Sequence, residues 1–289
     1  DDVRIFNREG IPIFDPVDEE GNFMQDMEFI AGLNVMEANR PISKKLKEKG
    51  LMFRQETVEH SYPFCWRTDT PLIYKPISTW FVKVESFRDR MVEHNRKVHW
   101  VPGHIRDGRF GKWLENARDW AISRNRFWGT PLPIWKSEDG DTLCFGSVEE
   151  LENVSETKVP DLHKQHVDQL VIEHQGKTYR RVTEVLDCWF ESGSMPYGQQ
   201  HYPFENKEVF EANFPANFIC EGLDQTRGWF YTLVVIAQAL FDKPAFHNCV
   251  VNGLILAEDG KKMSKRLKNY PDPTQMLDQY GADAIRLYM

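Results

Sequence analysis

The pattern of hydrophobic and polar positions predicts a chain that mixes helices and strands. Residues 34–50 repeat hydrophobic side chains at helical spacing and stop at Gly50, which is typical of an amphipathic helix. Residues 57–84 alternate and are rich in Pro, Thr and aromatic side chains, so we expect a β-ribbon there, with its clearest strand at 80–84. Helical spacing returns over residues 110–121.

The last hundred residues contain a strand, a helix and a second strand in succession. Residues 218–220 are a short apolar run, residues 225–241 have helical spacing after a good N-cap at Asp224, and residues 249–256 are again apolar. This order implies a parallel sheet with a right-handed crossover, and therefore an α/β fold. Ligands of such sheets bind beyond the carboxyl ends of the strands, where residues 221–225 would lie.

Two further segments complete the pattern. Acids, Gln and His dominate residues 136–182, which we interpret as an inserted subdomain leading into a short buried strand at 183–186. Near the end of the chain, Asp272 begins a capping box for a helix that should stop at Gly281, where a second helix follows.

Composition narrows the class of protein. With 289 residues and 41% hydrophobic positions the chain can bury a sizeable core. Its five cysteines form no C-x-x-C pair, and the histidines of residues 136–182 lack ligand spacing, so we predict reduced thiols, no zinc and no other metal site. No secretory signal is visible, and the longest apolar run, residues 229–241, is too short to span a membrane.

Positive charge is concentrated in two places although the net charge is −8. Residues 88–126 carry ten Lys or Arg against five acids, which leaves +5 there and −13 elsewhere. This stretch could meet a phosphate backbone, or it could be a surface of mixed charge pairs. Residues 261–268 (KKMSKRLK) hold five cations after the turn at 259–260, which suits a polyphosphate, although a solvated hairpin is the alternative.

Candidate binding residues cluster at the predicted strand end. Glu221 could bind an ammonium group, and Gly222 would let a ligand approach the backbone. Asp224 and Gln225 offer polar groups to a ribose or an amine, although Asp224 could serve only as a helix cap. Trp189 and Trp229 could wall a pocket for a branched aliphatic side chain, or could simply be core. Lys262 and Lys265 could contact phosphates, and backbone groups near Gly253, Leu254 and Ile255 could hold an adenine.

Several blocks of the chain resemble the class I aminoacyl-tRNA synthetases, and within them the isoleucine-specific family. Residues 262–266 (KMSKR) resemble the KMSKS signature of the class. Residues 221–230 (EGLDQTRGWF), 187–193 (DCWFESG), 123–129 (SRNRFWG) and 60–63 (HSYP) resemble blocks of the isoleucine family in the same order.

The resemblance implies roles for individual residues. Isoleucyl-adenylate would be held by Glu221, Gly222, Asp224 and Gln225, and the isoleucine side chain would lie between Trp189 and Trp229. Lys265 would bind ATP, with Lys262 and Ser264 in the same mobile loop, and Asp2 aligns with a carboxylate of the family's editing site. Arg266 and residues 269–273 (NYPDP) look most like the eukaryotic cytosolic form.

The HIGH signature of the class is missing, which implies an internal fragment. Residues 103–105 (GHI) do not replace it, because we expect them outside any strand-to-helix phosphate site. The predicted segments are the C-terminal part of the editing insertion (1–62), a β-ribbon return with a segment of the catalytic domain (63–135), a smaller inserted subdomain (136–183), the second half of the Rossmann-like catalytic domain (184–260), and the KMSKR loop with the following helices (261–289).

The implied function is ATP-dependent activation of isoleucine to isoleucyl-adenylate and its transfer to tRNA(Ile), by a larger aminoacyl-tRNA ligase in the cytoplasm. Mg²⁺ would accompany ATP, no zinc is expected, and other synthetases could be partners in a multi-enzyme complex. We expect the fragment alone to be inactive. The alternative is a synthetase-derived, non-catalytic binding or regulatory protein, and a sister enzyme for valine or leucine is a weaker rival.

Overall fold

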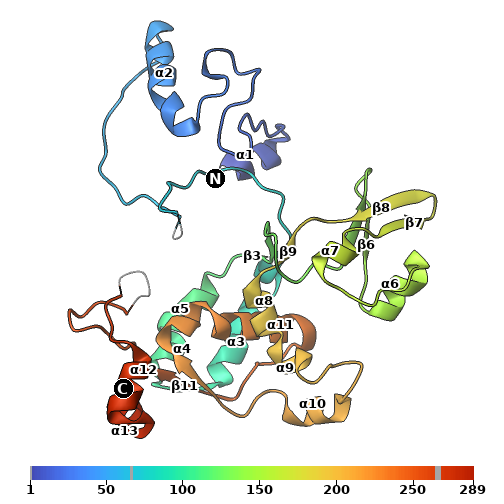
Figure 1. Cartoon of the computed structure of the whole chain (residues 1–289), viewed down its shortest axis with the longest axis vertical. Coiled ribbons are helices and arrows are strands. Elements are labelled where there is room, and N and C mark those ends of the chain that lie inside the picture. Colours follow the sequence, from blue (N-terminus) through green and yellow to red (C-terminus); the bar gives the residue numbers. More distant parts are fainter. Residues whose placement is uncertain (1, 66–67, 264–267) are drawn as a thin grey trace. The chain divides into compact units, whose positions relative to one another are not determined.

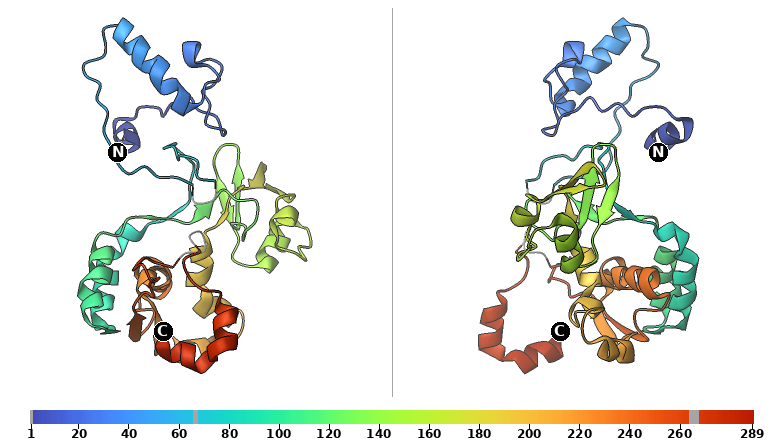
Figure 2. Two further views of the ribbon diagram at one scale, coloured as in Figure 1. Left: turned by 60° about the vertical axis from the view of Figure 1, so that its left-hand side comes forward. Right: turned by 90° about the vertical axis from the view of Figure 1, so that its right-hand side faces the viewer.

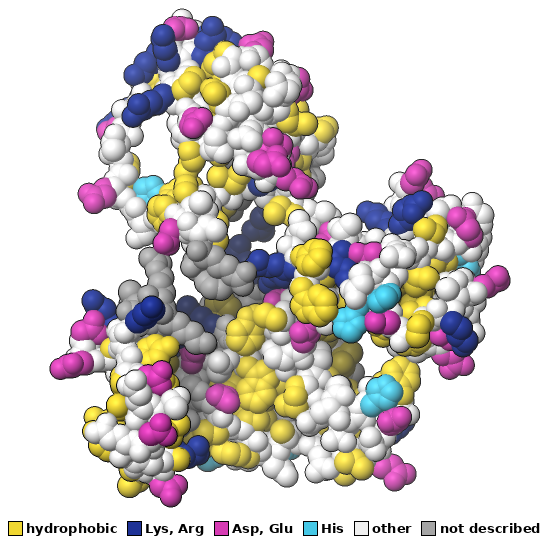
Figure 3. All heavy atoms as spheres, in the orientation of Figure 1, with side chains coloured by type: hydrophobic (Ala, Val, Ile, Leu, Met, Phe, Trp, Pro, Cys, Tyr) yellow, Lys and Arg dark blue, Asp and Glu magenta, His cyan; other side chains and the backbone are white. Residues whose placement is uncertain are grey.

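The chain divides into two compact units, Asp1–Ser78 and Thr79–Met289, in the computed structural model shown in Figure 1. The structure describes residues 2–65, 68–263 and 268–289. The helices of the first unit are α1 (Asp2–Glu9), the 3₁₀ helix η1 (Glu28–Ile30) and α2 (Val35–Glu48). Helix α2 confirms the helix predicted at 34–50. At its start, the Asn34 side chain accepts a hydrogen bond from the Met36 amide (3.1 Å). Lys and Arg side chains gather along α2 (Figure 3).

The β-ribbon predicted over residues 57–84 is wrong. Within the described part of that stretch, the structure has one isolated bridge, between Phe64 and Pro71, and the short strand β1 (Phe81–Val82). Three prolines interrupt the stretch, and a proline cannot donate a hydrogen bond to a strand ladder. β1 pairs with β3 (Trp120–Ala121). The last two residues of the helix predicted over 110–121 therefore belong to a strand, and the helix is shorter than expected.

A three-stranded parallel sheet lies at the centre of the second unit. Its order is β10 (Ile219–Gly222), β11 (Asn248–Asn252) and β2 (His99–Val101). The predicted α/β class with a parallel sheet is confirmed. β11 ends at Asn252 rather than at residue 256, and β2 was not predicted. Gly103 lies between β2 and the next helix, so residues 103–105 do occupy a strand-to-helix turn, contrary to expectation.

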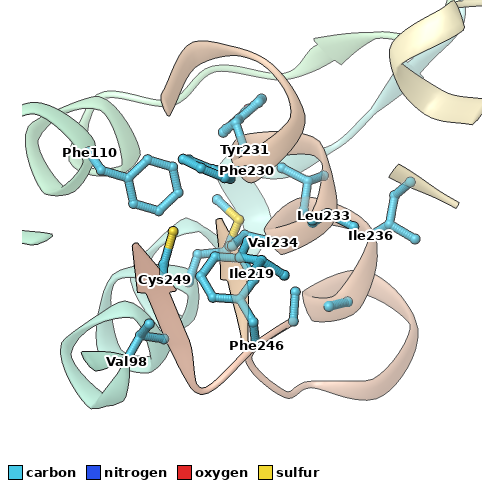
Figure 4. Packing of buried hydrophobic residues seen from close by; sticks show 14 of the residues in the cluster. Val98, Phe110, Ile219, Phe230, Tyr231, Leu233, Val234, Ile236, Phe246 and Cys249 are labelled. Carbon is cyan, nitrogen blue, oxygen red and sulfur yellow. The ribbon is translucent and has the colours of Figure 1, made fainter. Parts of the chain in front are cut away.

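Helices pack around this sheet and bury most of the core. They are α3 (Arg88–Lys97), α4 (His104–Asp107), α5 (Arg109–Glu115), α8 (Cys188–Gly193), α9 (Met195–Gly198), α10 (Lys207–Asn213) and α11 (Trp229–Phe241), with the 3₁₀ helices η2 (Val84–Ser86) and η3 (Leu223–Arg227). The helix predicted over 225–241 is split in two, because η3 precedes α11. Every residue of α11 from Phe230 to Gln238 is buried, and Figure 4 shows its side chains meeting Phe110, Ile219 and Phe246.

Residues 134–181 form a separate lobe, as Figures 1 and 2 show. An antiparallel sheet in the order β6-β5-β8-β7 is built from β5 (Ile134–Ser137), β6 (Thr142–Cys144), β7 (Val171–His174) and β8 (Lys177–Arg181). Two helices, α6 (Val148–Ser155) and α7 (Lys164–Val167), complete the lobe. Trp135, Ile172 and Tyr179 are buried in a core distinct from the main one. The predicted strand at 183–186 is found as β9 (Val185–Leu186), which pairs with β4 (Ser123–Arg124).

The chain ends in two helices, α12 (Pro273–Tyr280) and α13 (Ala282–Tyr288). The predicted cap is confirmed, since the Asp272 carboxylate accepts hydrogen bonds from the Thr274 and Gln275 amides (2.8 and 3.3 Å). Gly281 separates the two helices at φ +79°. None of the helices among the described residues has the length and apolar character needed to cross a membrane.

Candidate functional site

The carboxyl ends of β10 and β11 form the base of the candidate site. The two strands are parallel and in register, so Gly222 lies beside Asn252 and Glu221 beside Val251. Glu221 is exposed at this edge. Because both strands end here, the segments that follow them, η3 and residues 253–263, leave from the same side of the sheet.

Asp224 folds back over the end of β10. A Cβ atom added at Gly222 would lie only 2.8 Å from the Asp224 Oδ1 atom, so the absence of a side chain at Gly222 is what admits the carboxylate. The other oxygen, Oδ2, lies 3.6 Å from Nζ of Lys262. The two side chains are 47% and 63% exposed, so the pair contributes about 0–1 kcal/mol. Asp224 therefore links the strand end to the basic hairpin by a contact that is easily exchanged.

The basic segment begins as a hairpin, in agreement with the turn predicted at 259–260. Leu256 and Lys262 form an antiparallel bridge, and Gly260 takes φ +75° in the turn between them. Ser264 and Lys265, predicted to act with Lys262, lie outside the described residues. Lys262 is thus the described member of the predicted phosphate-binding set, and it points its ammonium group at Asp224.

Residues 253–255 were predicted to form the end of an apolar strand, with backbone groups facing an adenine. The structure shows them instead as an irregular connection between β11 and the hairpin. Leu254 and Ile255 are exposed, and Gly253 has open space around its Cα. Their backbone is thus outside the sheet ladder. The role of these residues in adenine binding stays a prediction.

Gln225, rather than Asp224, caps the helix that follows. Its Oε1 atom accepts a hydrogen bond from the Trp229 amide at 2.9 Å, one of the amides in the first turn of α11 that lack a partner within the helix. The prediction that Asp224 is the N-cap is wrong because η3 moves the helix start to Trp229. The side-chain amide nitrogen of Gln225 makes no hydrogen bond to any described residue and is the group left for a ligand.

Trp189 and Trp229 lie close together at the junction of α8 and α11. A Cβ atom at Gly228 would be 3.0 Å from the Trp189 ring, so this indole packs directly against the backbone in front of Trp229. Trp189 is 41% exposed, whereas Trp229 is partly buried and donates its indole N–H to the Ser192 carbonyl (3.0 Å). Both rings are anchored in the fold, and the exposed face of Trp189 is the one a ligand could reach.

One feature of the site was missed by the sequence reading. The buried Asp187 carboxylate accepts the N–H of Trp189 at 3.3 Å and pairs with the Arg124 guanidinium at 2.7 Å. Arg124 lies 63 positions earlier in the chain, on the far side of the inserted lobe, so no local pattern could have joined them. The pair fixes the start of α8 and with it the Trp189 ring. Asp2, the predicted editing residue, is the first residue of α1 in the other unit.

Comparison with known proteins shows the family. Residues 23–289 match the family model described as "tRNA synthetases class I (I, L, M and V)", so the chain belongs to this family. The fold is that of a fragment of the class I catalytic domain, consistent with the parallel sheet.

Curated proteins similar to this chain include isoleucine–tRNA ligases. That of Chlamydia abortus is 60% identical over 96% of this chain and 27% of its own length, and that of Protochlamydia amoebophila is 59% identical over 97% and 27%. A solved structure of Mycobacterium tuberculosis methionyl-tRNA synthetase in complex with methionyl-adenylate has 18% identity and a TM-score of 0.49, covering 78% of this chain and 36% of that one.

Two consequences follow from these relatives. The chain spans about a quarter of the length of the curated relatives it matches. The expectation of a eukaryotic cytosolic form is not confirmed, because these relatives are bacterial.

Proposed function

We propose that the protein containing this chain activates isoleucine with ATP and transfers it to tRNA(Ile). The observation that carries the proposal is the contact between Asp224 and Lys262, which joins the strand-end block and the basic hairpin at one edge of the parallel sheet. These are the two segments that an aminoacyl-adenylate would have to touch at once. Identity of 59–60% to isoleucine–tRNA ligases supports isoleucine as the amino acid.

The arrangement suggests how the substrates are bound. The isoleucine ammonium group would replace Lys262 as the cation beside Asp224, with Glu221 as a second carboxylate at the same edge. Because the exposed pair is worth only about 0–1 kcal/mol, this exchange costs little. Lys262 would then be free to turn to the phosphates of ATP, together with Ser264 and Lys265.

The side chain and the nucleotide would occupy the two ends of the site. The isoleucine side chain would lie on the exposed face of Trp189, with Trp229 behind it. The amide nitrogen of Gln225 is available to the ribose or to the amino group. The backbone at Gly253, Leu254 and Ile255 would meet the adenine.

The chemistry is catalysis by position and charge. A carboxylate oxygen of isoleucine attacks the α-phosphorus of ATP, and the bond to the bridging oxygen breaks as pyrophosphate leaves with the electron pair. Cations at the leaving group stabilise the charge that develops there. A ribose hydroxyl of the terminal adenosine of tRNA then attacks the activated carbonyl, and AMP leaves.

Mg²⁺ would accompany ATP as a counter-ion of its phosphates. No group of three His, Cys, Asp or Glu among the described residues could hold a metal ion, so the phosphates themselves would be its main ligands. We propose no zinc site.

The free cysteines fit a reducing cytoplasm. An association with other synthetases would be tested by isolating the complete protein from its own cells.

Pyrophosphate exchange on the complete gene product tests the proposal, with isoleucine, valine and leucine compared side by side. We expect isoleucine to give the fastest transfer of label from pyrophosphate into ATP. A faster rate with valine or leucine would identify a sister enzyme. No exchange with any of the three would favour the non-catalytic binding protein, an alternative that the close ligase relatives do not support.

A further inference from the structure

A hollow lies next to the candidate site, where α5 meets the end of η3. It has a volume of about 460 Å³ and is lined by Gly108, Arg109, Lys112, Trp113, Asn116 and Arg227. Three of these side chains are cations and none is a carboxylate. In a chain of net charge −8, a pocket whose charged lining residues are all cations indicates an anionic ligand.

Half of the ten cations in residues 88–126, the pocket's Arg109 and Lys112 among them, have no ion pair to a described residue. Elsewhere in the basic stretch, carboxylates pair with Arg88, Arg90, Lys97, Arg106 and Arg124. No ion pair to a described residue is found for Arg109, Lys112 or Arg227. The mixed charge pairs considered for residues 88–126 therefore account for part of the stretch and leave this pocket positive.

Two of the three cations are held in place before any ligand binds. Arg109 donates from Nε to the Thr226 hydroxyl (3.0 Å), which in turn donates to the Leu223 carbonyl (2.7 Å). The Arg227 guanidinium lies over the Trp113 ring, 5.1 Å from its centroid. A planar guanidinium fixed in this way is suited to two parallel hydrogen bonds with phosphate oxygens.

We propose that this pocket binds a backbone phosphate of the tRNA substrate, an inference that rests on the proposed function. Arg227 covers one face of the Trp113 ring, so a ligand approaching from that side meets a guanidinium rather than an indole, which favours a phosphate contact over base stacking. Asp224 and Arg227 are three residues apart in η3, about 6 Å along a 3₁₀ helix. One extended RNA strand can therefore span from the pocket to the adenylate.

The test uses the complete protein with Lys112→Gln, which removes one pocket cation without disturbing the Arg109 or Arg227 contacts. Each phosphate contact contributes about 0.7–0.9 to the slope of log affinity against log salt, which corresponds to about 5- to 8-fold in affinity at 0.1 M salt. We expect Lys112→Gln to weaken tRNA(Ile) binding by that factor and to reduce the slope by that amount. Lys112→Arg should retain wild-type binding.

The matched control is Lys207→Gln, which removes an exposed lysine of α10. It should leave tRNA affinity within about twofold of wild type, since long-range charge effects are screened. Pyrophosphate exchange, which needs no RNA, should stay within about twofold of wild type for Lys112→Gln.

The outcomes separate this inference from the proposed function. Equal tRNA affinity and salt slope in Lys112→Gln and Lys207→Gln would overturn the phosphate pocket while leaving the activity intact. A rise in the KM for ATP with unchanged tRNA affinity would assign the pocket to the nucleotide instead and would also overturn it. Absence of isoleucine-dependent exchange in the wild-type protein would refute the proposed function independently of the RNA measurement.

Discussion

Gln225 is predicted to serve two purposes with the two ends of one amide group, and substitutions can separate them. Its oxygen accepts the Trp229 N–H at 2.9 Å, and its nitrogen is free for the adenylate. Gln225→Ala removes both, whereas Gln225→Glu keeps an oxygen acceptor and removes the nitrogen donor. A carboxylate at the start of a helix also interacts favourably with the helix dipole.

The loss of a helix cap costs about 0.5–2 kcal/mol, typically about 1. We expect the typical value of about 1 kcal/mol here, because Gln225 satisfies one amide at the start of α11, the Trp229 N–H. For a unit of this size, 1 kcal/mol lowers the unfolding temperature by about 2–4 °C. We therefore expect Gln225→Ala to melt about 2–4 °C lower and Gln225→Glu to melt within about 1 °C of wild type.

Thermal unfolding and pyrophosphate exchange are measured on the same three proteins. If the nitrogen binds the adenylate, both variants lose exchange although only Gln225→Ala loses stability. The exposed Gln165→Ala serves as a control for the Gln-to-Ala change itself. An unchanged unfolding temperature in Gln225→Ala would refute the capping argument, and wild-type exchange in Gln225→Glu would refute the role of the nitrogen.

Three further predictions concern the basic segment at residues 261–268, the helix packing and the inserted lobe. Lys265→Ala in the complete protein should slow the proposed isoleucine-dependent exchange at least about tenfold, or about 1.4 kcal/mol, and an unchanged rate would contradict the assignment. Gly193→Ala should destabilise by about 1–3 kcal/mol in denaturant unfolding, because its Cβ would lie 2.9 Å from Ile236 and little can shift, whereas Gly198→Ala has open space and should be nearly neutral. Hydrogen bonds from Lys177 and then Ser137 lower the pKa of Asp139 to about 2, so its contribution to stability is present above pH 3.8 and lost as the pH falls towards 2; the stability difference between wild type and Asp139→Asn should shrink over that window, and a constant difference would count against it.

The sequence predicted the elements that carry their own local signals. The helix at α2 has a cap, a periodic face and a glycine stop, and the strands β10 and β11 are apolar runs bounded by polar turns. Asp272 and Gly281 likewise mark their helix by capping chemistry that operates within a few residues. The signals that start or end these elements come from residues close by in the sequence, although β10 and β11 also need each other to form a sheet.

The misses have physical causes that lie far along the chain. β2 is three residues long and alternates exposed and buried positions, and it becomes a strand only because β11 lies beside it. The helix expected to continue to residue 121 stops because Trp120 and Ala121 pair with β1. Asp224 was expected to cap a helix that in fact begins one 3₁₀ helix later.

The same limit applies to the candidate site. The strand-end block and the hairpin could be recognised from their residue types, since each is contiguous in sequence. The contact of Asp224 with Lys262, and the pairing of Arg124 with Asp187, join positions 38 and 63 residues apart and depend on the sheet and on the neck of the inserted lobe. Those contacts, rather than the motifs, determine which groups are free to meet a ligand.

The pairing of β4 with β9 brings the two ends of the lobe at residues 134–181 together. Ser123 lies opposite Leu186 and Arg124 opposite Val185, so the chain leaves the catalytic unit and returns to it at nearly the same point. Closing a loop becomes only about 0.6 kcal/mol harder for each doubling of its length. The lobe should therefore behave as an exchangeable module, one that could be lengthened, trimmed or replaced by an unrelated small domain with little effect on the parallel sheet beneath it.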